Sequence, residues 1–487
     1  MPTIVGATRT GRSPGSDHRA AGRVLAMPSP TSMRNNEKTI FGWAMYDWAN
    51  SAYITAGSLI FAIYFGDTIF PEDGFSAFGI SVGAEAFFGI LVGIGALLLF
   101  LAMPILGAVA DYSNSKKRLL ETFAYTGATF AMLTAVPGAG DLGLAVVVAL
   151  FAQIGFVSAN VMYEGFLPEL TTPDTIDRVS ARGFAFGYAG GGIHLVLSLL
   201  LLFFAEPLGI AETTAQRIVI ASAGVWWAGF AAFSFTRLRD AGVARPIPAK
   251  FQSAPRPLAY ARLGLDRTWR TTRQLVGFPQ LLLFVVAFLF YNDGVQTVIK
   301  ITPVFASETL DLSTTVIAAV FVVIQLVAFF GALTFGWMAG RVGTKRAILV
   351  SIAGWTLVTV GGHLMPARQG APFLLLGVLA GLVLGGVQAL SRSLYGSMIP
   401  EEASAEFFGF YSVFSKFSAI FGPLIFAAVD IATGSARLSI LFLTAFFIIG
   451  GALLSRVDVE AARASRTRWQ LNEGLPPPRR QPRNESL

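Results

Sequence analysis

Charged side chains inside the long apolar stretches of this sequence are the residues best placed to do chemistry. Five of them are two aspartates, a glutamate, an arginine and a lysine: Asp47, Glu164, Asp293, Arg392 and Lys416. Lys300, close to the outer end of its stretch, is expected to extend to the interface instead. An ionisable side chain at bilayer depth costs at least about 2.5 kcal/mol on insertion scales, so it normally faces a partner or a water-filled cavity. The set therefore predicts a polar site inside an otherwise apolar protein.

Asp47 and Arg392 are predicted to form an ion pair across the molecule. At a rise of about 1.5 Å per residue, Asp47 lies about 9 Å into its stretch, and Arg392 lies about 8 Å from the same membrane surface. Opposite charges at similar depth relieve each other's desolvation. We therefore expect the two side chains to meet in a gate on the cytoplasmic side.

The other three charges have different expected roles. Asp293 is near mid-depth, and because burial disfavours the charged form of a carboxylate, it could carry a coupling proton. Lys416 lies about 15 Å into its stretch, where it is expected to face a cavity. Glu164 is near the end of its stretch, so its side chain could either face the cavity or extend to the interface.

Uncharged polar residues accompany these charges and could bind a small solute that carries no fixed charge. They are amides, tyrosines and one serine: Asn50, Tyr53, Asn160, Tyr163, Tyr291, Asn292, Gln296, Gln388 and Ser391. For any single member, a hydrogen bond between two helices is the alternative. As a cluster, they predict a substrate or coupling cavity.

Twelve apolar stretches carry these residues, and each is long enough to cross a bilayer. The chain of 487 residues is 54% hydrophobic and 13% charged, which leaves too little polar surface for a water-soluble body. A membrane helix needs about 20 mostly apolar residues, whereas barrel strands alternate over about ten. We predict an all-α membrane protein with twelve transmembrane helices in two pseudo-symmetric six-helix bundles. The predicted helices are 41–65, 86–108, 119–137, 142–166, 182–205 and 217–235, then 279–302, 314–338, 347–365, 373–397, 406–429 and 438–455.

Basic residues lie almost entirely on one side of this predicted membrane. Of the 36 lysines and arginines, only six lie in outer loops or spans: Arg217, Arg368, Arg437, Lys300, Arg392 and Lys416. Because basic loops are retained in the cytoplasm, both termini are predicted to be cytoplasmic. The net charge of +7 then follows from topology, and we expect no binding of nucleic acid.

Composition divides the chain into two tails, two bundles and a linker. The predicted ranges are a disordered basic cytoplasmic tail, the N-terminal bundle, a basic cytoplasmic linker, the C-terminal bundle and a second disordered cytoplasmic tail: 1–38, 39–235, 236–278, 279–456 and 457–487. In the linker, Leu258, Leu265 and Trp269 are mixed with arginines, which predicts a helix lying on an anionic leaflet. A solvated linker is the alternative.

The two halves repeat short motifs in the same order, as carriers built by duplication do. The pairs are YDWAN with YNDGV, GAVADYSNSKKR with GWMAGRVGTKR, and YEGFLPE with YGSMIPE. The second pair follows the second and eighth predicted helices, and combines glycine for close packing with charges that can cap a helix or form ion pairs. We predict a gating loop in each half, although the basic residues could serve topology alone. The gating residues are Gly107, Asp111, Arg118, Gly336, Arg341 and Arg346.

Enzymatic chemistry is not expected of this chain. It has three histidines, no cysteine and no HExxH motif, so a zinc centre lacks its usual ligands. It also has no GxxxxGK[ST] loop for nucleotide phosphates. We therefore predict no cofactor and no metal site. The expected protein is a monomeric, gradient-driven carrier with a small-molecule solute, protons and the lipid bilayer as its partners.

Five motifs give the sequence a resemblance to a known family. They are WAMYDWANSAY at 43–53, SARGFAFGY at 180–188, FYNDGVQT at 290–297, GGVQALSRSLYG at 385–396 and EFFGFYSVFSKFSAIFGP at 406–423. The chain resembles the vacuole effluxer family of autophagy-related-protein-22-like carriers, within the major facilitator superfamily. The gating loops are also similar to the signature loop of that superfamily, with Tyr112 and Gly340 departing from it.

The resemblance implies an alternating-access carrier whose first, fourth, seventh and tenth helices line the cavity. Fungal members are associated with release of amino acids from the vacuole, which implies outward movement of a small polar solute such as an amino acid. With the coupling proton suggested by Asp293, the leading hypothesis is a proton-linked secondary transporter. The compact loops and arginine-rich tails are typical of bacteria, which predicts the bacterial cytoplasmic membrane. Two alternatives remain open: a translocase for lipids or amphiphiles, and a membrane scaffold without transport activity.

Overall fold

The computed structural model describes residues 34–71, 74–77, 80–240 and 245–466 of the chain. Ten helical segments in this part are long and apolar enough to cross a membrane. Two further helices, α4 (Lys116–Leu133) and α12 (Thr344–His363), begin with basic residues and take the third and ninth predicted positions. Each of the twelve predicted stretches thus coincides with a helical segment.

The first half contains six spans, and a short hairpin follows the first of them. The first span bends through two π-type turns and consists of α1 (Glu37–Ala52), η2 (Tyr53–Gly57), α2 (Ser58–Tyr64) and η3 (Phe65–Ile69). The hairpin pairs β1 (Phe75–Ala77) with β2 (Ile80–Val82), an addition to the predicted all-α fold. The remaining helices are α3 (Ala84–Ser113), α4, α5 (Leu142–Gly165), α6 (Leu167–Leu170), α7 (Ile176–Ala205) and α8 (Glu212–Phe235).

The second half repeats this plan after the linker. The linker contains the 3-10 turn η4 (Ala249–Phe251) and the helix α9 (Arg256–Leu275). The spans are α10 (Pro279–Val304) with η5 (Phe305–Thr309), α11 (Thr314–Val342), α12, α13 (Gly370–Met398), the 3-10 turn η6 (Glu401–Ala403) with α14 (Ser404–Thr433), and α15 (Ala436–Phe442) with α16 (Thr444–Ser455). The first and seventh spans both end in a five-residue π-type turn that begins at a phenylalanine, Phe65 or Phe305, which adds to the internal repeat.

The predicted tails differ from the structure where they adjoin the bundles. Glu37 and Lys38 form the first turn of α1 because Asn36 caps it, accepting hydrogen bonds from the backbone N–H groups of Lys38 and Thr39. Residues 459–466 form the helix α17 (Val459–Arg466), where Asp458 accepts a hydrogen bond from the N–H of Ala461. Residues 1–33 and 467–487 lie outside the described part, so the disorder predicted there is untested.

Two large apolar cores correspond to the two halves. One is built around Trp43, Trp227 and neighbouring aliphatic residues of the first half, and it includes Ala405 and Val413 of α14. The other is built around Trp355, Phe447 and the inner faces of α10, α12 and α13. Close approach of helices also uses glycine: a Cβ at Gly190 would meet the backbone of Trp48.

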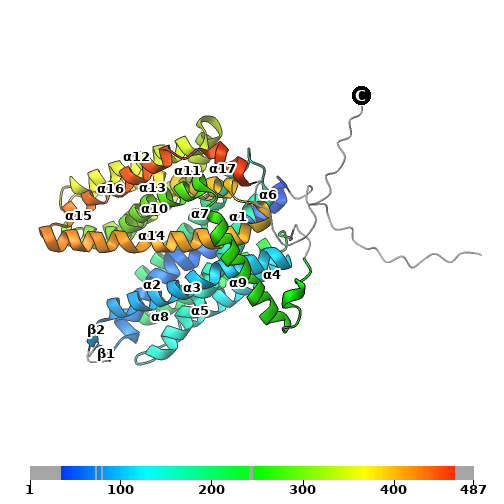
Figure 1. Cartoon of the computed structure of the whole chain (residues 1–487). Coiled ribbons are helices and arrows are strands. Elements are labelled where there is room, and N and C mark those ends of the chain that lie inside the picture. The colour runs from blue at the N-terminus through cyan, green and yellow to red at the C-terminus, as the bar shows by residue number, and fades with distance from the viewer. Residues whose placement is uncertain (1–33, 72–73, 78–79, 241–244, 467–487) are drawn as a thin grey trace, which may run out of the picture.

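The two bundles meet at one end of the molecule and spread apart towards the other. Figure 1 shows them converging near α6 and α17 and separating towards β1, β2 and α15. We call the first the closed end and the second the open end. Polar contacts between the halves gather at the closed end, where α3 and α5 pack against α14 and α7 packs against α11 and α13.

Candidate functional site

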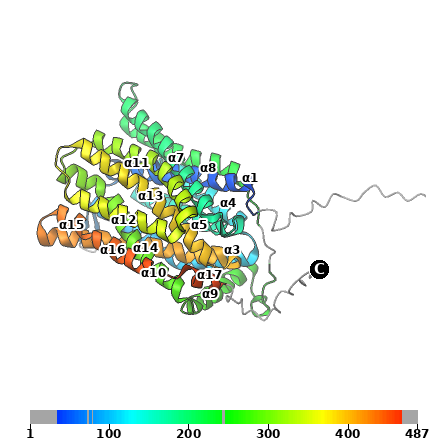
Figure 2. The ribbon, with the colours of Figure 1, turned by 90° about the horizontal axis from the view of Figure 1, so that it is seen from above.

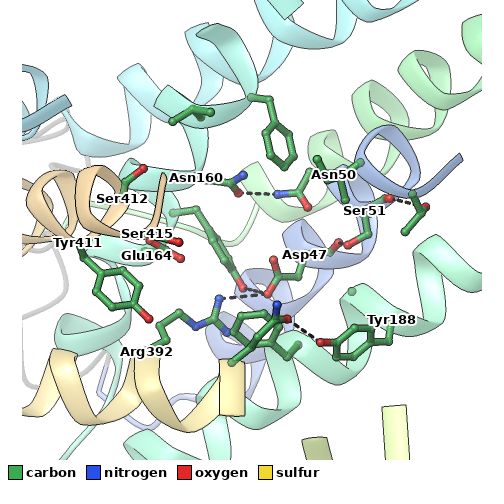
Figure 3. A pocket seen from close by; sticks show the side chains of 18 of the residues that line it. Asp47, Asn50, Ser51, Asn160, Glu164, Tyr188, Arg392, Tyr411, Ser412 and Ser415 are labelled. Atoms are coloured by element: carbon green, nitrogen blue, oxygen red, sulfur yellow. Dashed lines mark hydrogen bonds and ion pairs between the residues drawn. The ribbon is translucent and has the colours of Figure 1, made fainter. Parts of the chain in front are cut away.

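A polar cavity of about 270 Å³ lies between the halves. Seven helical segments supply its walls: α1, η2, α5, α7, α11, α13 and α14. Eight of the predicted site residues line it: Asp47, Asn50, Asn160, Tyr163, Glu164, Gln388, Arg392 and Lys416. Two acids and two bases thus face one space, and Figure 3 shows side chains from both halves pointing into it.

Asp47 and Arg392 meet in this cavity, as the sequence analysis predicts. Arg392 Nη1 lies 3.3 Å from Asp47 Oδ2, and the Tyr163 hydroxyl donates a hydrogen bond of 2.8 Å to the same oxygen. The Arg392 side chain is only 2% exposed, whereas that of Asp47 is 14% exposed. The carboxylate is therefore the partner more accessible to a solute.

Arg392 is held by more than its ion pair. Its Nε and Nη2 atoms donate to the hydroxyl and the carbonyl of Ser180 at 3.0 and 2.9 Å. Its guanidinium also lies 4.1 Å from the ring centre of Phe184 and 4.9 Å from that of Trp43. These contacts fix a planar cation at the boundary between α13 and α7, a role that lysine fills poorly.

Two amide contacts brace the cavity walls. Asn50 donates to Asn160 at 2.8 Å, which ties α1 to α5 within the first half. Tyr188 donates to Gln388 at 2.6 Å, which ties α7 to α13 across the halves (Figure 3). Since these amides have donors and acceptors left over, each can also contact a solute.

Glu164 and Lys416 complete the charges of the cavity. Glu164 is half-buried near the end of α5 and faces the cavity, which is the first of its two expected placements. Lys416 is exposed to the cavity from α14, beside Ser412 and Ser415. The cavity therefore offers a cation and an anion besides the Asp47–Arg392 pair.

Six predicted site residues lie outside the lining of this cavity. Tyr53 packs against Phe156 and Trp227, and Tyr291 bonds to Ser391 at 2.7 Å, as contacts between helices. Asn292 and Gln296 also lie on α10, which contributes no lining residue within the described part of the chain. The seventh helix was expected to line the cavity, and α14 takes its place because it packs over α10.

Asp293 is the sixth, and its carboxylate binds the backbone of α14. Its Oδ1 accepts a hydrogen bond of 2.9 Å from the N–H of Gly422. Gly422 precedes Pro423, which interrupts the backbone hydrogen bonds of α14, and a Cβ at position 422 would collide with Thr297. Asp293 is 2% exposed, so this contact is sealed within the second bundle.

The predicted gating loop of the first half contacts the start of α14. Asp111 accepts hydrogen bonds from the N–H groups of Ala405 and Glu406, at 3.2 and 2.9 Å, and so caps the start of α14. Lys116 is buried beside it, 3.2 Å from Asp111 and 2.6 Å from Glu169, and also bonds to Ser404. A Cβ on Gly107 would meet the carbonyl of Ala405, which explains glycine there.

The other predicted gating residues are arranged differently. Arg118 and Arg346 are exposed, and Arg341 stacks on Trp337, 3.7 Å from its ring centre. Gly336 permits α11 to approach Ala181 of α7. In the second half the acid missing at position 340 is replaced by Asp177 of α7, which accepts from Thr344 and Ser393 at 2.6 and 2.5 Å.

Sequence reasoning missed several cavity residues. They are mainly hydroxyl groups and one amide: Ser51, Thr55, Tyr188, Gln325, Tyr411, Ser412 and Ser415. Tyr188 and the α14 residues fall within motifs already noted for their resemblance, so those motifs carried a usable signal. Gln325 is an isolated amide in the apolar helix α11, and only the packing of α11 against α7 brings it to the cavity.

Comparisons with known proteins agree on the type of molecule. The family model described as vacuole effluxer Atg22 like matches residues 35–467. An uncharacterized MFS-type transporter, YxiO of Bacillus subtilis, is 31% identical over 88% of this chain and 97% of its own length. Autophagy-related protein 22-1 of Phaeosphaeria nodorum is 26% identical over 73% of this chain and 72% of its own.

Solved structures of the major facilitator superfamily share the fold. The proton:xylose symporter XylE, bound to 6-bromo-6-deoxy-D-glucose, matches with a TM-score of 0.64 at 13% identity, covering 88% of this chain and 99% of XylE. The transporter FucP in its outward conformation matches with a TM-score of 0.61, also at 13% identity, over 86% of this chain and 98% of its own. At this identity the likeness concerns the fold.

Proposed function

Because the chain belongs to the Atg22-like vacuole effluxer family of the major facilitator superfamily, we propose that it moves a small polar solute by alternating access, with proton coupling and with amino-acid efflux as its physiological direction. A transporter of this type is not an enzyme. It lies in the membrane as an integral multi-pass protein. What we propose beyond family membership is the kind of substrate, the coupling ion and the direction of transport.

One observation carries the proposal most directly: charged residues of both halves face one cavity, and the halves are tied together at the closed end. Asp47, Glu164, Arg392 and Lys416 face the cavity, and the Asp111 contacts join α3 to the start of α14. Charges at this depth are retained only where they meet a partner, a solute or water. A solute with both an anionic and a cationic group, such as an amino acid, would satisfy Lys416 and Glu164 together.

The excess of basic residues supports assigning the closed end to the cytoplasm. The helices α1, α9 and α17 reach this end (Figure 1). In the sequence they border the tails and the linker, which hold most of the arginines. The cavity would then face outward, with the inner gate shut. The bacterial relative YxiO supports the bacterial cytoplasmic membrane as the location.

Proton coupling rests on the buried carboxylates. Asp293 is sealed within the second bundle and binds the backbone of α14, one of the helices that line the cavity. A change in its protonation would alter that bond and thereby the shape of α14. Glu164 faces the cavity directly and could exchange protons with solvent there.

Counterflow in reconstituted vesicles tests the proposal. Purified protein is placed in vesicles loaded with one unlabelled amino acid at a time, and uptake of the labelled form is followed with and without a pH gradient. We expect accumulation for a subset of amino acids, faster with the gradient, and at least tenfold slower for Asp47→Asn. Asp430→Asn, a carboxylate change on α14 outside the cavity lining, serves as the matched control.

The same vesicles separate the alternatives. Movement of labelled phospholipid between leaflets, without counterflow of any polar solute, would replace the proposal with a lipid translocase. Absence of both activities in a folded protein would favour a scaffold. Counterflow without any effect of the pH gradient would support a carrier function and contradict proton coupling.

A further inference from the structure

The linker helix α9 is attached to the transporter by one face. Its buried residues include Leu263, Arg267 and Thr271. Gly264 lies against the backbone of Ile105 in α3, and Arg267 Nε donates to Glu406 of α14 at 2.7 Å. Both members of this ion pair are almost fully buried, at 5% and 0% exposure. The helix is therefore fixed to the closed end through both halves.

The opposite face of α9 is apolar as well, which a helix in water would not need. Leu258, Leu265, Trp269 and the adjoining Val276 are spaced by seven, four and seven residues, and so they fall on one side of the helix. Leu265, Trp269 and Val276 are 60%, 59% and 75% exposed. This outward stripe lies on the side of the helix away from Leu263 and Arg267.

Cations surround the outward stripe. Arg256, Arg262 and Arg273 are exposed, and Arg273 stacks on Trp269 with its guanidinium 4.8 Å from the ring centre. The one acid of α9 is Asp266, which is occupied by Lys250 and Arg270 at 2.9 and 2.6 Å. The exposed face of α9 therefore presents a net positive charge around an apolar centre.

The helix also has the orientation of an interfacial helix. Figure 1 shows α9 running across the direction of α3 and α14, and Figure 2 shows it at the edge of the molecule. It packs against the late part of α3, at the closed end, and against α10. A helix crossing the spans at the edge of a bundle turns its free face towards the bilayer surface.

We propose that the outward stripe of α9 docks into the inner leaflet and binds the headgroups of anionic phospholipids. The apolar side chains enter the headgroup region, Arg262 and Arg273 pair with phosphates, and Trp269 occupies the interface. This inference rests on the proposed cytoplasmic location of the closed end. Since Arg267 links α9 to Glu406, beside the cap made by Asp111, bound lipid would also brace the gate.

The absence of cysteine from the chain allows a direct test on the full-length protein. Single variants Leu258→Cys, Leu265→Cys and Val276→Cys are labelled with a nitroxide and reconstituted in vesicles of phosphatidylcholine or of an equal mixture with phosphatidylglycerol. Relaxation by oxygen, which partitions into lipid, is compared with relaxation by a water-soluble nickel chelate. Ser253→Cys, exposed in the linker before α9, is the control.

We expect the three stripe labels to respond to oxygen in the mixed vesicles, and Ser253→Cys to respond to nickel in both. Replacing Arg262 or Arg273 by glutamine should lower the ratio of embedded to water-exposed label about fivefold per residue, and high salt should do the same. Stripe labels open to nickel in both vesicles would overturn the proposal in favour of a solvated linker.

Equal embedding in the two vesicle types would overturn the recognition of anionic lipid. The measurement needs no transported solute, so its failure is distinguishable from failure of the proposed transport. Both leaflets of these vesicles have the same composition, so the result does not depend on which way the protein inserts.

Discussion

Asp47 of α1 and Arg392 of α13 are 345 residues apart in the sequence, yet their Oδ2 and Nη1 atoms lie 3.3 Å apart. The pair joins the two halves at the base of the cavity, just where an inward opening of the molecule would have to separate them. Tyr163 lies in the same half as Asp47 and donates to it, so Asp47 keeps this partner when the halves separate. Ser180 lies in the first half, so Arg392 would lose Ser180 together with Asp47, and separation at this point breaks several bonds at once.

Neutralising both members of this pair should cost less stability than the two single changes added together. Arg392→Gln leaves Asp47 without its cation, and Asp47→Asn leaves a buried guanidinium, which costs about 3–5 kcal/mol where desolvation is complete. The double variant removes both charges, so its loss of unfolding free energy should be smaller than the sum of the two single losses by about 0.5–3 kcal/mol. Unfolding of the three variants by denaturant in detergent measures this coupling. Additive losses would show that the two side chains act independently.

Exchanging the two charges should fail to restore transport, for a reason that lies in the surroundings of Arg392. An aspartate at position 392 would face the carbonyl of Ser180 and the rings of Trp43 and Phe184, all of which favour a cation. We expect uptake by Asp47→Arg with Arg392→Asp to stay at least tenfold below the unaltered protein. Rescue to near-normal uptake would show that transport needs one charge of each sign at these two positions, whichever position carries which.

Removing the cap on α14 should open the closed end. Asp111→Asn weakens two bonds to the start of α14 and removes one of the two anions beside the buried Lys116, leaving it with Glu169, at a cost of about 1–3 kcal/mol to the closed state. Nitroxide labels on Arg118→Cys and Arg346→Cys, exposed positions in opposite halves, report the separation of the bundles by pulsed dipolar spectroscopy. The distance distribution should gain a longer component. Glu121→Gln, which breaks only the exposed Lys117–Glu121 pair, should leave it unchanged.

The fold could be predicted from the sequence because each span is a continuous apolar stretch that must satisfy its own backbone. Charges within those stretches were predictable site residues for the same energetic reason, and Asp47, Glu164, Arg392 and Lys416 all line the cavity. The predicted contact between Asp47 and Arg392 needed only equal depth and opposite sign. The spans, the charged cavity residues and this contact could be predicted from residue type and position along the sequence alone.

The rest of the site depends on which side of each helix faces inward. Asp293 was expected in the cavity, but its carboxylate binds the Gly422 backbone behind α14. Gln325 was overlooked because it is a single amide in a stretch whose other polar residues are threonines. In an all-round apolar helix, no periodicity distinguishes the lipid face from the cavity face, so these assignments required the packing of α14 over α10 and of α11 against α7.

Filling the space at Gly107 should prevent the closed end from forming. A side chain there would meet the carbonyl of Ala405. The backbones of α3 and α14 would have to move apart, and this would break the cap made by Asp111. Gly107→Val should therefore favour the longer distances between labels at 118 and 346 and slow counterflow at least tenfold. Gly340→Ala is the matched control, since no atom lies within 4 Å of a Cβ at that position. That change should be neutral or stabilise helix α11 by up to about 1 kcal/mol. Equal effects at the two positions would contradict a gate built on close packing.

Asp293→Asn should separate the structural role of this residue from its proposed role in coupling. The asparagine side chain keeps a carbonyl oxygen that can accept the Gly422 N–H, but it cannot bind and release a proton. We expect the variant to fold with normal stability, to exchange solute in counterflow, and to lose the acceleration by a pH gradient.

Two further variants serve as controls. Asp293→Leu, which removes the acceptor as well, should lose stability by about 1–3 kcal/mol because the backbone N–H of Gly422 loses this hydrogen bond. Thr297→Val removes only the longer 3.5 Å contact to the same oxygen, so it should keep its response to the gradient. Gradient-driven uptake that persists in Asp293→Asn would assign the proton to another group, with Glu164 of the cavity as the next carboxylate to neutralise.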